Sequence, residues 1–188
     1  MADQLDRYRP GSDEERADLA RARSLLARPD AFDRTRPLHV TGSALIVHPP
    51  SGRLLLRWHE RLDGWFQVGG HGDPGETDPF LVAMREGREE TGLDDLRPWP
   101  GPEPRIEHLV VVPVPAAKGE PDHEHLDVRY LLATDHPERA RAEHDGADVH
   151  WATVEEALTL VREENLALLV RRLRPLLLGA PGAGAGRA

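Results

Sequence analysis

The chain has 188 residues, and its 24 Lys and Arg against 33 Asp and Glu give a net charge of −9. This acidic balance argues against a protein that coats nucleic acid, and the absence of cysteine excludes disulfides, thiolate metal sites and cysteine nucleophiles. No apolar run reaches the roughly 18–20 residues of a membrane span, and the polar first residues lack the apolar core of a signal peptide. We therefore expect a cytoplasmic protein that has neither a membrane nor a nucleic-acid polymer as its partner.

The first half of the chain predicts one helix followed by short strands. Residues 1–12 are polar and contain Pro10–Gly11, so we expect a flexible N-terminus. Ser12 is a suitable cap for a helix from residue 13 to about residue 27, because acids occupy its first turn. β-prone runs separated by turn residues predict three strands, at 38–47, 53–58 and 64–68, of which the first two form a hairpin.

The second half predicts two helices and further strands. Asp78 as N-cap, Pro79 in the first position and Gly92 after the last predict a helix over 79–91. A long helix is expected from residue 154 to about 178, with Pro175 kinking or ending it. Strands are expected at 105–114, 125–133 and 149–151, and a disordered Gly/Ala-rich tail at 179–188. This order predicts an α/β fold of the α+β type, with helices packed on a mixed sheet, in a single domain at 13–178.

Three glutamates of the helix over 79–91 lie close together. Glu86, Glu89 and Glu90 are spaced i, i+3 and i+4, so they share one face with Cβ atoms about 5–6 Å apart. At that separation two carboxylates repel each other by about 3 kcal/mol for an effective dielectric near 20. Such a cluster suits Mg²⁺ or Mn²⁺, which accept carboxylate, water and phosphate oxygens. By itself the run favours an ordinary solvated acidic face, so the metal site depends on its surroundings.

A glycine-rich turn at 69–76 precedes this helix. Its glycines present main-chain carbonyls and amides with no side chains in the way. Arg85 precedes Glu89 by four residues and can brace it, and Glu76 can reach back to Arg85 or to a metal-bound water. Gly87 costs roughly 1 kcal/mol relative to Ala inside a helix, but it lets the helix lie close to a neighbouring strand.

Together, Gly70-x5-Glu76 and Arg85-Glu86-Gly87-x-Glu89-Glu90-x-Gly92-Leu93 closely resemble the Nudix box of MutT-type hydrolases. The usual pattern is G-x5-E-x7-R-E-U-x-E-E-x-G-U, where U is a bulky aliphatic residue. Here eight residues separate Glu76 from Arg85, and Gly87 replaces the aliphatic residue. We expect the extra residue to lengthen the loop at 77–79 and to leave the glutamates in register.

The resemblance implies a Nudix-like α/β/α sandwich and metal-dependent hydrolysis of a diphosphate linked to another group, often a nucleoside. Carried onto this chain, it implies that Glu86, Glu89 and Glu90 bind Mg²⁺ or Mn²⁺. A carbonyl of Gly69 or Gly70 would add a ligand.

The same resemblance assigns the remaining roles. Arg85 and Glu76 would orient the acids. A carboxylate would remove a proton from the attacking water, and it could belong to the box or to a distal acid before the late Trp-containing strand. At that place Glu143 is our first candidate and Asp145 the second, and the alternative for each is an ordinary loop acid.

Further polar residues are candidates for substrate binding. His123, His125 and Asp127 alternate onto one side of a strand, where they could contact substrate phosphates, form a second metal site or be a polar strand end. Of the two functional options we favour substrate contact. His71 in the glycine turn and Arg57 are further candidates for contact with the diphosphate.

Several alternatives stay open at this level. The substrate could be a nucleoside triphosphate, a dinucleotide, a nucleotide sugar or a biosynthetic diphosphate. The chain could also be a non-catalytic Nudix-fold ligand-binding or sensor module. An isopentenyl diphosphate isomerase shares the fold, but its chemistry is associated with a cysteine that this chain lacks. The first and last helices could each mediate a homodimer or pack on their own sheet.

Overall fold

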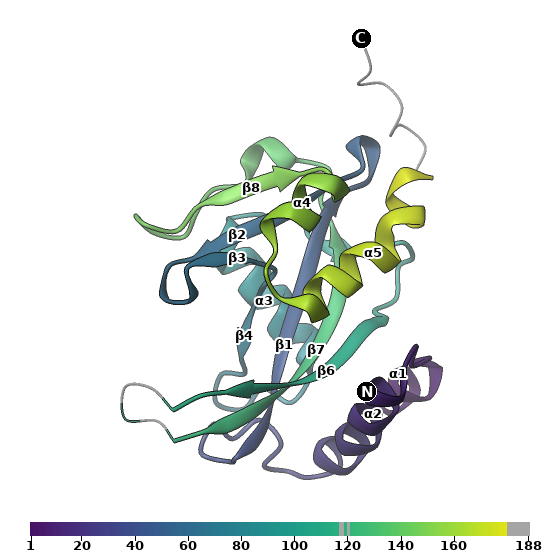
Figure 1. The fold of residues 1–188 in the computed structure, drawn as a ribbon, viewed down its shortest axis with the longest axis vertical. Coiled ribbons are helices and arrows are strands. Elements are labelled where there is room, and N and C mark those ends of the chain that lie inside the picture. The colour runs from purple at the N-terminus through teal and green to yellow at the C-terminus, as the bar shows by residue number, and fades with distance from the viewer. Residues whose placement is uncertain (117–118, 120, 180–188) are drawn as a thin grey trace.

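The computed structural model describes residues 1–116, 119 and 121–179, and it is built around one long central strand (Figure 1). This strand, β1 (Leu38–His48), pairs in parallel with β7 (His123–Ala133) along almost its whole length. On its other side it pairs antiparallel with β4 (Val68–His71) toward its start and with β2 (Arg53–His59) at its end. Because β4 and β2 pair with different ends of β1, the sheet splits into two branches on the side of β1 that faces away from β7.

The remaining strands extend the sheet on both sides. Strands β3 (Gly64–Phe66) and β8 (Val149–Ala152) both pair antiparallel with β2. Strands β6 (Ile106–Val114) and β5 (Arg97–Pro98) both pair antiparallel with β7. The sheet is therefore mixed, as the sequence predicts.

Helices cover the two faces of the sheet. Helix α3 (Pro79–Thr91) packs on one face, and helices α4 (Val154–Leu160) and α5 (Glu164–Leu178) pack on the other. Side chains alternate between the faces of a strand, so Ala44 and Ile46 join the α3 side while Leu45 and Val47 join the α4 and α5 side. This arrangement confirms the expected α/β/α sandwich. Three short 3₁₀ helices complete the elements, η1 (Pro49–Ser51), η2 (Glu60–Leu62) and η3 (Pro137–Arg139).

The N-terminal residues differ from the expected flexible segment. Residues Ala2–Arg7 form helix α1, which lies beside helix α2 (Asp13–Leu26) and strand β6 (Figure 1). Leu5 and Tyr8 are buried, and the Tyr8 hydroxyl donates to Glu15 at 2.8 Å and accepts from the Leu109 amide at 3.2 Å. These two side chains order a segment whose composition is otherwise polar.

A second network fixes helix α2 to the far end of the chain. Glu15 is buried, and its carboxylate accepts hydrogen bonds from the Gly11 amide and from Arg172 of α5. Burial acts to raise the pKa of Glu15, but Arg172, Gly11 and Tyr8 outweigh it and lower the pKa to about 2. The predicted cap is also present, since Ser12 Oγ accepts from the Glu15 amide.

The long C-terminal helix is two helices. Val161 is extended, and the break lets α4 pack on β2 and β8 while α5 turns toward β6. No Gly or Pro marks residues 161–163, so composition did not signal the break. Pro175 lies within α5, which continues to Leu178, and the predicted tail lies outside the described residues from position 180 onward. Among the described helices, none combines the length and the apolar character that crossing a bilayer requires.

Candidate active site

Helix α3 has the bounds that the sequence predicts and packs closely on the sheet. Asp78 accepts from the Phe80 amide at 2.9 Å, and Gly92 ends the helix in the left-handed conformation at φ 65°. A Cβ on Gly42 of β1 would lie 2.2 Å from a carbonyl of α3, and one on Gly87 would lie 2.9 Å from Leu96. These two glycines let the helix approach the strands closely. They thereby set the distance between the glutamates of α3 and the sheet.

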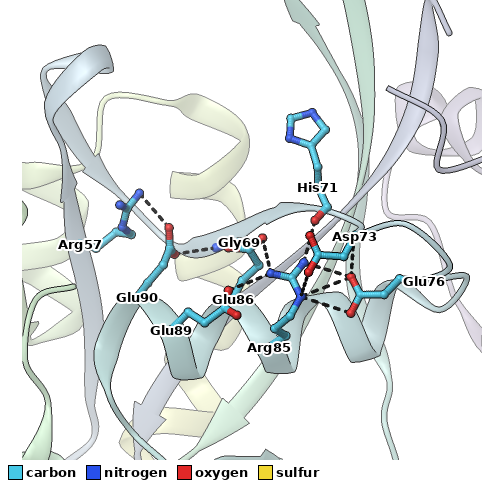
Figure 2. A network of polar contacts seen from close by, with 9 residues as sticks. All are labelled: Arg57, Gly69, His71, Asp73, Glu76, Arg85, Glu86, Glu89 and Glu90. Carbon is cyan, nitrogen blue, oxygen red and sulfur yellow. Dashed lines mark hydrogen bonds and ion pairs between the residues drawn. The ribbon is translucent and has the colours of Figure 1, made fainter. Parts of the chain in front are cut away.

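Arg85 is the centre of the polar network shown in Figure 2. Its Nη1 donates to Glu86 at 3.0 Å and to Glu89 at 2.8 Å. Its Nη2 donates to the His71 carbonyl at 2.8 Å and to Glu76 at 3.0 Å. The contacts that we expect from Arg85 to Glu89 and Glu76 are therefore both present, and the extra residue of the loop does not keep Glu76 away.

Glu90 is the most buried of the three glutamates. Only 8% of its surface is exposed, and its carboxylate accepts from the Gly69 amide at 3.0 Å and pairs with Arg57 at 3.1 Å. Burial raises the pKa of Glu90 to about 7, against the opposing effects of Arg57 and the Gly69 amide. Arg57 is thus held in place by a carboxylate rather than free in solvent.

Glu86 packs directly on the glycine turn. A Cβ on Gly70 would lie 2.5 Å from Glu86 Oε1, so a side chain at this position would collide with the carboxylate. Burial raises the pKa of Glu86, and the charges of Glu89 and Glu143 raise it further. Glu143 also raises the pKa of Glu90, so the charge of this distal acid reaches both box carboxylates, although its own side chain is exposed.

The charges and donor atoms of the site fit a divalent cation. Among the described residues, the two guanidinium groups of Arg57 and Arg85 pair with five carboxylates, those of Asp73, Glu76, Glu86, Glu89 and Glu90. Carboxylate and carbonyl oxygens are the ligands that Mg²⁺ and Mn²⁺ prefer. The donor set and the surplus negative charge are therefore compatible with the metal that the sequence analysis predicts.

A cavity of about 450 Å³ lies next to this network. Its wall includes Arg57, Gly69 and Gly70 from the box side and His71, His125 and Asp127 from the sheet. Its volume falls within the roughly 300–1,000 Å³ of small-molecule pockets. The cavity thus brings together most of the residues that we predict to bind substrate, while His123 lines a neighbouring cavity of about 390 Å³.

Asp127 lies in the wall with its oxygens already engaged. Its Oδ1 accepts from Thr41 at 3.1 Å and from Ser43 at 2.6 Å, and its Oδ2 accepts from Arg129 at 2.7 Å and Gln67 at 3.3 Å. This geometry makes Asp127 an anchor for other cavity residues. Its predicted direct contact with substrate stays a prediction.

Sequence reasoning missed part of the cavity wall. Thr41 and Ser43 line it, and His39 lies beside it on the same face of β1. These residues alternate as polar positions at the start of a strand that is otherwise apolar. That period-2 pattern is the signal that could have found them.

Four histidines gather beside the glycine turn. The His71 Nε2 lies 3.1 Å from the Nε2 of His39 and 3.1 Å from that of His125, and the His125 Nε2 lies 3.2 Å from that of His123. Burial is the main cause that lowers the pKa of His71 to about 3 and that of His125 to about 4, and it also lowers the pKa of His39. The expected strand-side pair of His123 and His125 is therefore part of a larger cluster.

Comparison with known proteins identifies the family. The family model described as NUDIX domain matches residues 37–173, so the chain belongs to the Nudix family and is a hydrolase of that family. Members of the family generally carry out metal-dependent hydrolysis of nucleoside diphosphate derivatives. The comparison with curated proteins found no match.

Solved structures of other Nudix proteins share the fold. A C. elegans Ap4A hydrolase in a binary complex is 21% identical, with 74% of this chain and 98% of that chain covered and a TM-score of 0.57. The E. coli dihydroneopterin triphosphate pyrophosphohydrolase is 21% identical, with 75% and 97% covered and a TM-score of 0.56. A Nudix hydrolase from M. smegmatis is 20% identical, with 73% and 84% covered and a TM-score of 0.53. At these identities the likeness shows a common fold.

Proposed function

We propose that this protein hydrolyses a diphosphate linkage in a small, nucleotide-like substrate with the help of Mg²⁺ or Mn²⁺. The observation that carries the proposal is the position of the glutamate cluster. Glu86 and Glu90 are held against Gly70 and Gly69, and these glycines form part of the wall of the cavity of about 450 Å³. The box glutamates are not among the described residues that line the cavity, so a diphosphate there would lie across these glycines from the carboxylates.

The box residues divide into those that would hold metal and those that would position them. Glu86, Glu89, Glu90 and a carbonyl of Gly69 or Gly70 would hold the ion. When bound, the ion supplies charge neutralisation on the diphosphate and a lower pKa for the attacking water.

Arg85 and Glu76 would act as positioning residues in this proposal. Arg85 contacts Glu86 and Glu89 at once, while Glu76 accepts from Arg85 and from the Asp73 amide at 2.7 Å. Hydrogen bonds to both sides of the guanidinium restrict its rotation. The carboxylates would then be held in their binding geometry before substrate arrives.

The proton of the attacking water needs a carboxylate acceptor. We keep Glu143 as the first candidate, because its charge acts on Glu86 and Glu90, and Asp145 as the second. A box glutamate is the alternative. Water attack at phosphorus would place the proton on this group and release the leaving phosphate.

The cavity wall suggests how substrate would bind. Arg57, His71 and His125 would lie beside the phosphates, His123 would do so from the neighbouring cavity, and Asp127 would hold the wall in place. Leu62 and Phe66 add apolar surface that suits a planar group. The names of the Ap4A hydrolase and the dihydroneopterin triphosphate pyrophosphohydrolase, which share this fold, support a nucleotide-like polyphosphate. A cytoplasmic location and a homodimer stay predictions.

The proposal is tested with a panel of nucleoside diphosphate derivatives, with Mg²⁺ or Mn²⁺ added and released phosphate or diphosphate measured. We expect turnover by the natural sequence and a loss of about 10³-fold in Glu90→Gln, because the variant removes a charged ligand but keeps the shape of the side chain. Glu14→Gln on α2 is the matched control and should retain full activity. Full activity of Glu90→Gln would refute the metal role, and no turnover on a broad panel would favour the non-catalytic binding module.

A further inference from the structure

The histidine cluster is assembled by the pairing of three strands. His39 of β1 lies opposite His125 of the parallel strand β7, and His71 of β4 lies opposite Thr41, two residues along β1. His123 is the first residue of β7 and lies two residues before His125, on the same side of the strand. Strand register therefore brings four rings together from positions as far apart as 39 and 125.

Backbone carbonyls fix the protonation of the two outer rings. The Nδ1 of His39 lies 2.9 Å from the Arg36 carbonyl, and the Nδ1 of His123 lies 2.9 Å from the Pro121 carbonyl. A carbonyl oxygen only accepts hydrogen bonds, so each of these Nδ1 atoms carries the proton. In a neutral imidazole the other nitrogen then presents a lone pair. His39 and His123 thus both direct an Nε2 lone pair into the cluster.

Neutral rings cannot satisfy the cluster by hydrogen bonds alone. The Nε2 atoms form a chain in the order His39, His71, His125, His123, with separations of 3.1, 3.1 and 3.2 Å. Each contact needs one proton and one lone pair, so donors and acceptors would have to alternate along the chain. A chain of four atoms that alternates has unlike ends, yet both ends here are lone pairs. At least one close contact is left without a hydrogen bond.

We propose that His39, His71 and His125 bind one divalent transition-metal ion of the Zn²⁺ type. A cation between these three rings turns their converging lone pairs into ligands. Ligand atoms of a tetrahedral zinc site, at 2.0–2.1 Å from the ion, are about 3.3 Å apart, close to the 3.1 Å that separates the His71 Nε2 from those of His39 and His125. The carbonyl of Arg36 then orients the His39 ring, as second partners of metal-bound histidines generally do.

This ligand set differs from that of the glutamate cluster. The nearest candidate atoms of His39, His71 and His125 all lie within 4.8 Å of one another, and all are imidazole nitrogens. Imidazole favours Zn²⁺, Ni²⁺ or Cu²⁺, whereas Mg²⁺ and Mn²⁺ favour oxygen. The two clusters would therefore take different ions from the same solution.

The cluster is reachable and is attached to the active site. His71 and His125 line the cavity of about 450 Å³, and His39, His71 and His123 line the cavity of about 390 Å³, so an ion can enter without unfolding. The His71 carbonyl accepts from Arg85 at 2.8 Å. An ion on the His71 ring would thus fix one end of the turn that contains Gly69 and Gly70.

The experiment measures Zn²⁺ binding to the metal-free full chain by calorimetry, with excess Mg²⁺ present to occupy the oxygen site. We expect one Zn²⁺ per chain, and the same stoichiometry in the triple variant Glu86→Gln, Glu89→Gln, Glu90→Gln. Because loss of a group that only orients a ligand weakens metal sites 10–100-fold, His39→Gln and His125→Gln should each weaken binding by about 100-fold or more. His136→Gln, at a half-buried histidine outside the cluster, is the matched control and should bind as the natural sequence does.

A second measurement keeps the test valid if a variant folds poorly. Circular dichroism of each metal-free variant checks the fold, and visible absorption of the Co²⁺-loaded protein reports tetrahedral nitrogen ligation directly in the natural sequence. No stoichiometric Zn²⁺ binding in the presence of Mg²⁺ would overturn the proposal. Unchanged binding in folded His39→Gln and His125→Gln, or binding lost in the triple glutamate variant, would do the same. None of these outcomes depends on hydrolytic activity.

Discussion

The glutamate cluster of α3 and the histidine cluster of the strands meet at one residue and are built in opposite ways. The glutamates come from a single stretch of helix and are held by the guanidinium of Arg85. The histidines come from three strands and are held by sheet register and backbone carbonyls. His71 belongs to both, because its carbonyl accepts from Arg85 while its ring faces His39. Neighbouring atoms of one residue thus belong to two chemically different clusters.

The two clusters also differ in how they respond to protons. Burial raises the pKa of Glu90 to about 7, because the buried site disfavours its charge. Burial lowers the pKa of His71 and His125, because their charged form is likewise disfavoured. The same physical cause therefore keeps both kinds of group neutral, but over different ranges of pH.

The largest effect that separates the clusters is expected from Arg85→Ala. Removing the guanidinium releases Glu86, Glu89 and Glu76 together, so kcat/KM for a diphosphate substrate should fall about 10²–10³-fold. Zn²⁺ stoichiometry should not change, since the histidine rings keep their strand positions. Steady-state kinetics and calorimetry check the two parts. Arg88→Ala, an exposed arginine of the same helix, is the control, and an equal loss in that variant would contradict the role of Arg85.

The next effect concerns the free energy of unfolding of the metal-free protein, on which the two clusters should impose opposite pH dependences. Folded Glu90, with its pKa raised from 4.5 to about 7, binds a proton that the unfolded chain has released, so it should cost up to about 3 kcal/mol of stability as pH rises from about 4.5 to 7. His125, with its pKa lowered from 6.5 to about 4, should instead add stability as pH rises from about 4 to 6.5.

Urea unfolding at several pH values measures both slopes. Glu90→Gln should reduce the loss of stability above pH 4.5, because Glu86, whose pKa burial also raises, keeps its share, and His125→Gln should reduce the gain below pH 6.5. Each variant serves as the control for the other. Identical pH profiles of the two variants would show that the clusters are not independently titrating groups.

The smallest expected effect is on stability and concerns the close packing of helix α3 at Gly87. In Gly87→Ala the gain in helix propensity of about 1 kcal/mol opposes a Cβ placed 2.9 Å from the end of the flexible Leu96 side chain, so stability should change by no more than about 1 kcal/mol. Gly87→Leu overpacks the same space and should cost about 1–3 kcal/mol. Thermal unfolding compares both with Gly101→Ala, where a Cβ meets nothing within 4 Å. If Gly87→Leu left the thermal stability unchanged, the close packing of α3 at this position would be contradicted.

The sequence predicted those features that depend on residues close together in the chain. The bounds of α3 follow from Asp78, Pro79 and Gly92, and the contact of Arg85 with Glu89 follows from a spacing of four residues. The mixed sheet and its covering helices follow from the order of the predicted elements. The glutamate roles themselves stay proposals.

What the sequence did not predict depends on long-range pairing or on isolated residues. His39 joins the histidines only because β1 pairs with β4 and β7, and sequence spacing carries no trace of that register. The break near Val161 depends on how α4 and α5 pack on different strands, and the order of α1 depends on burying Leu5 and Tyr8. In each case tertiary contacts determine the structure, and the local composition does not reveal them.

The network of Tyr8, Glu15 and Arg172 has a consequence for where the protein can be cut. The family match begins at residue 37, yet these contacts join the first helices to the last one across that boundary. A chain trimmed to the matched range would leave the Leu109 amide and the Arg172 guanidinium without their acceptors. The predicted domain limits at 13 and 178 stay predictions, and we expect a chain trimmed to residues 37–173 to unfold more easily than the full chain.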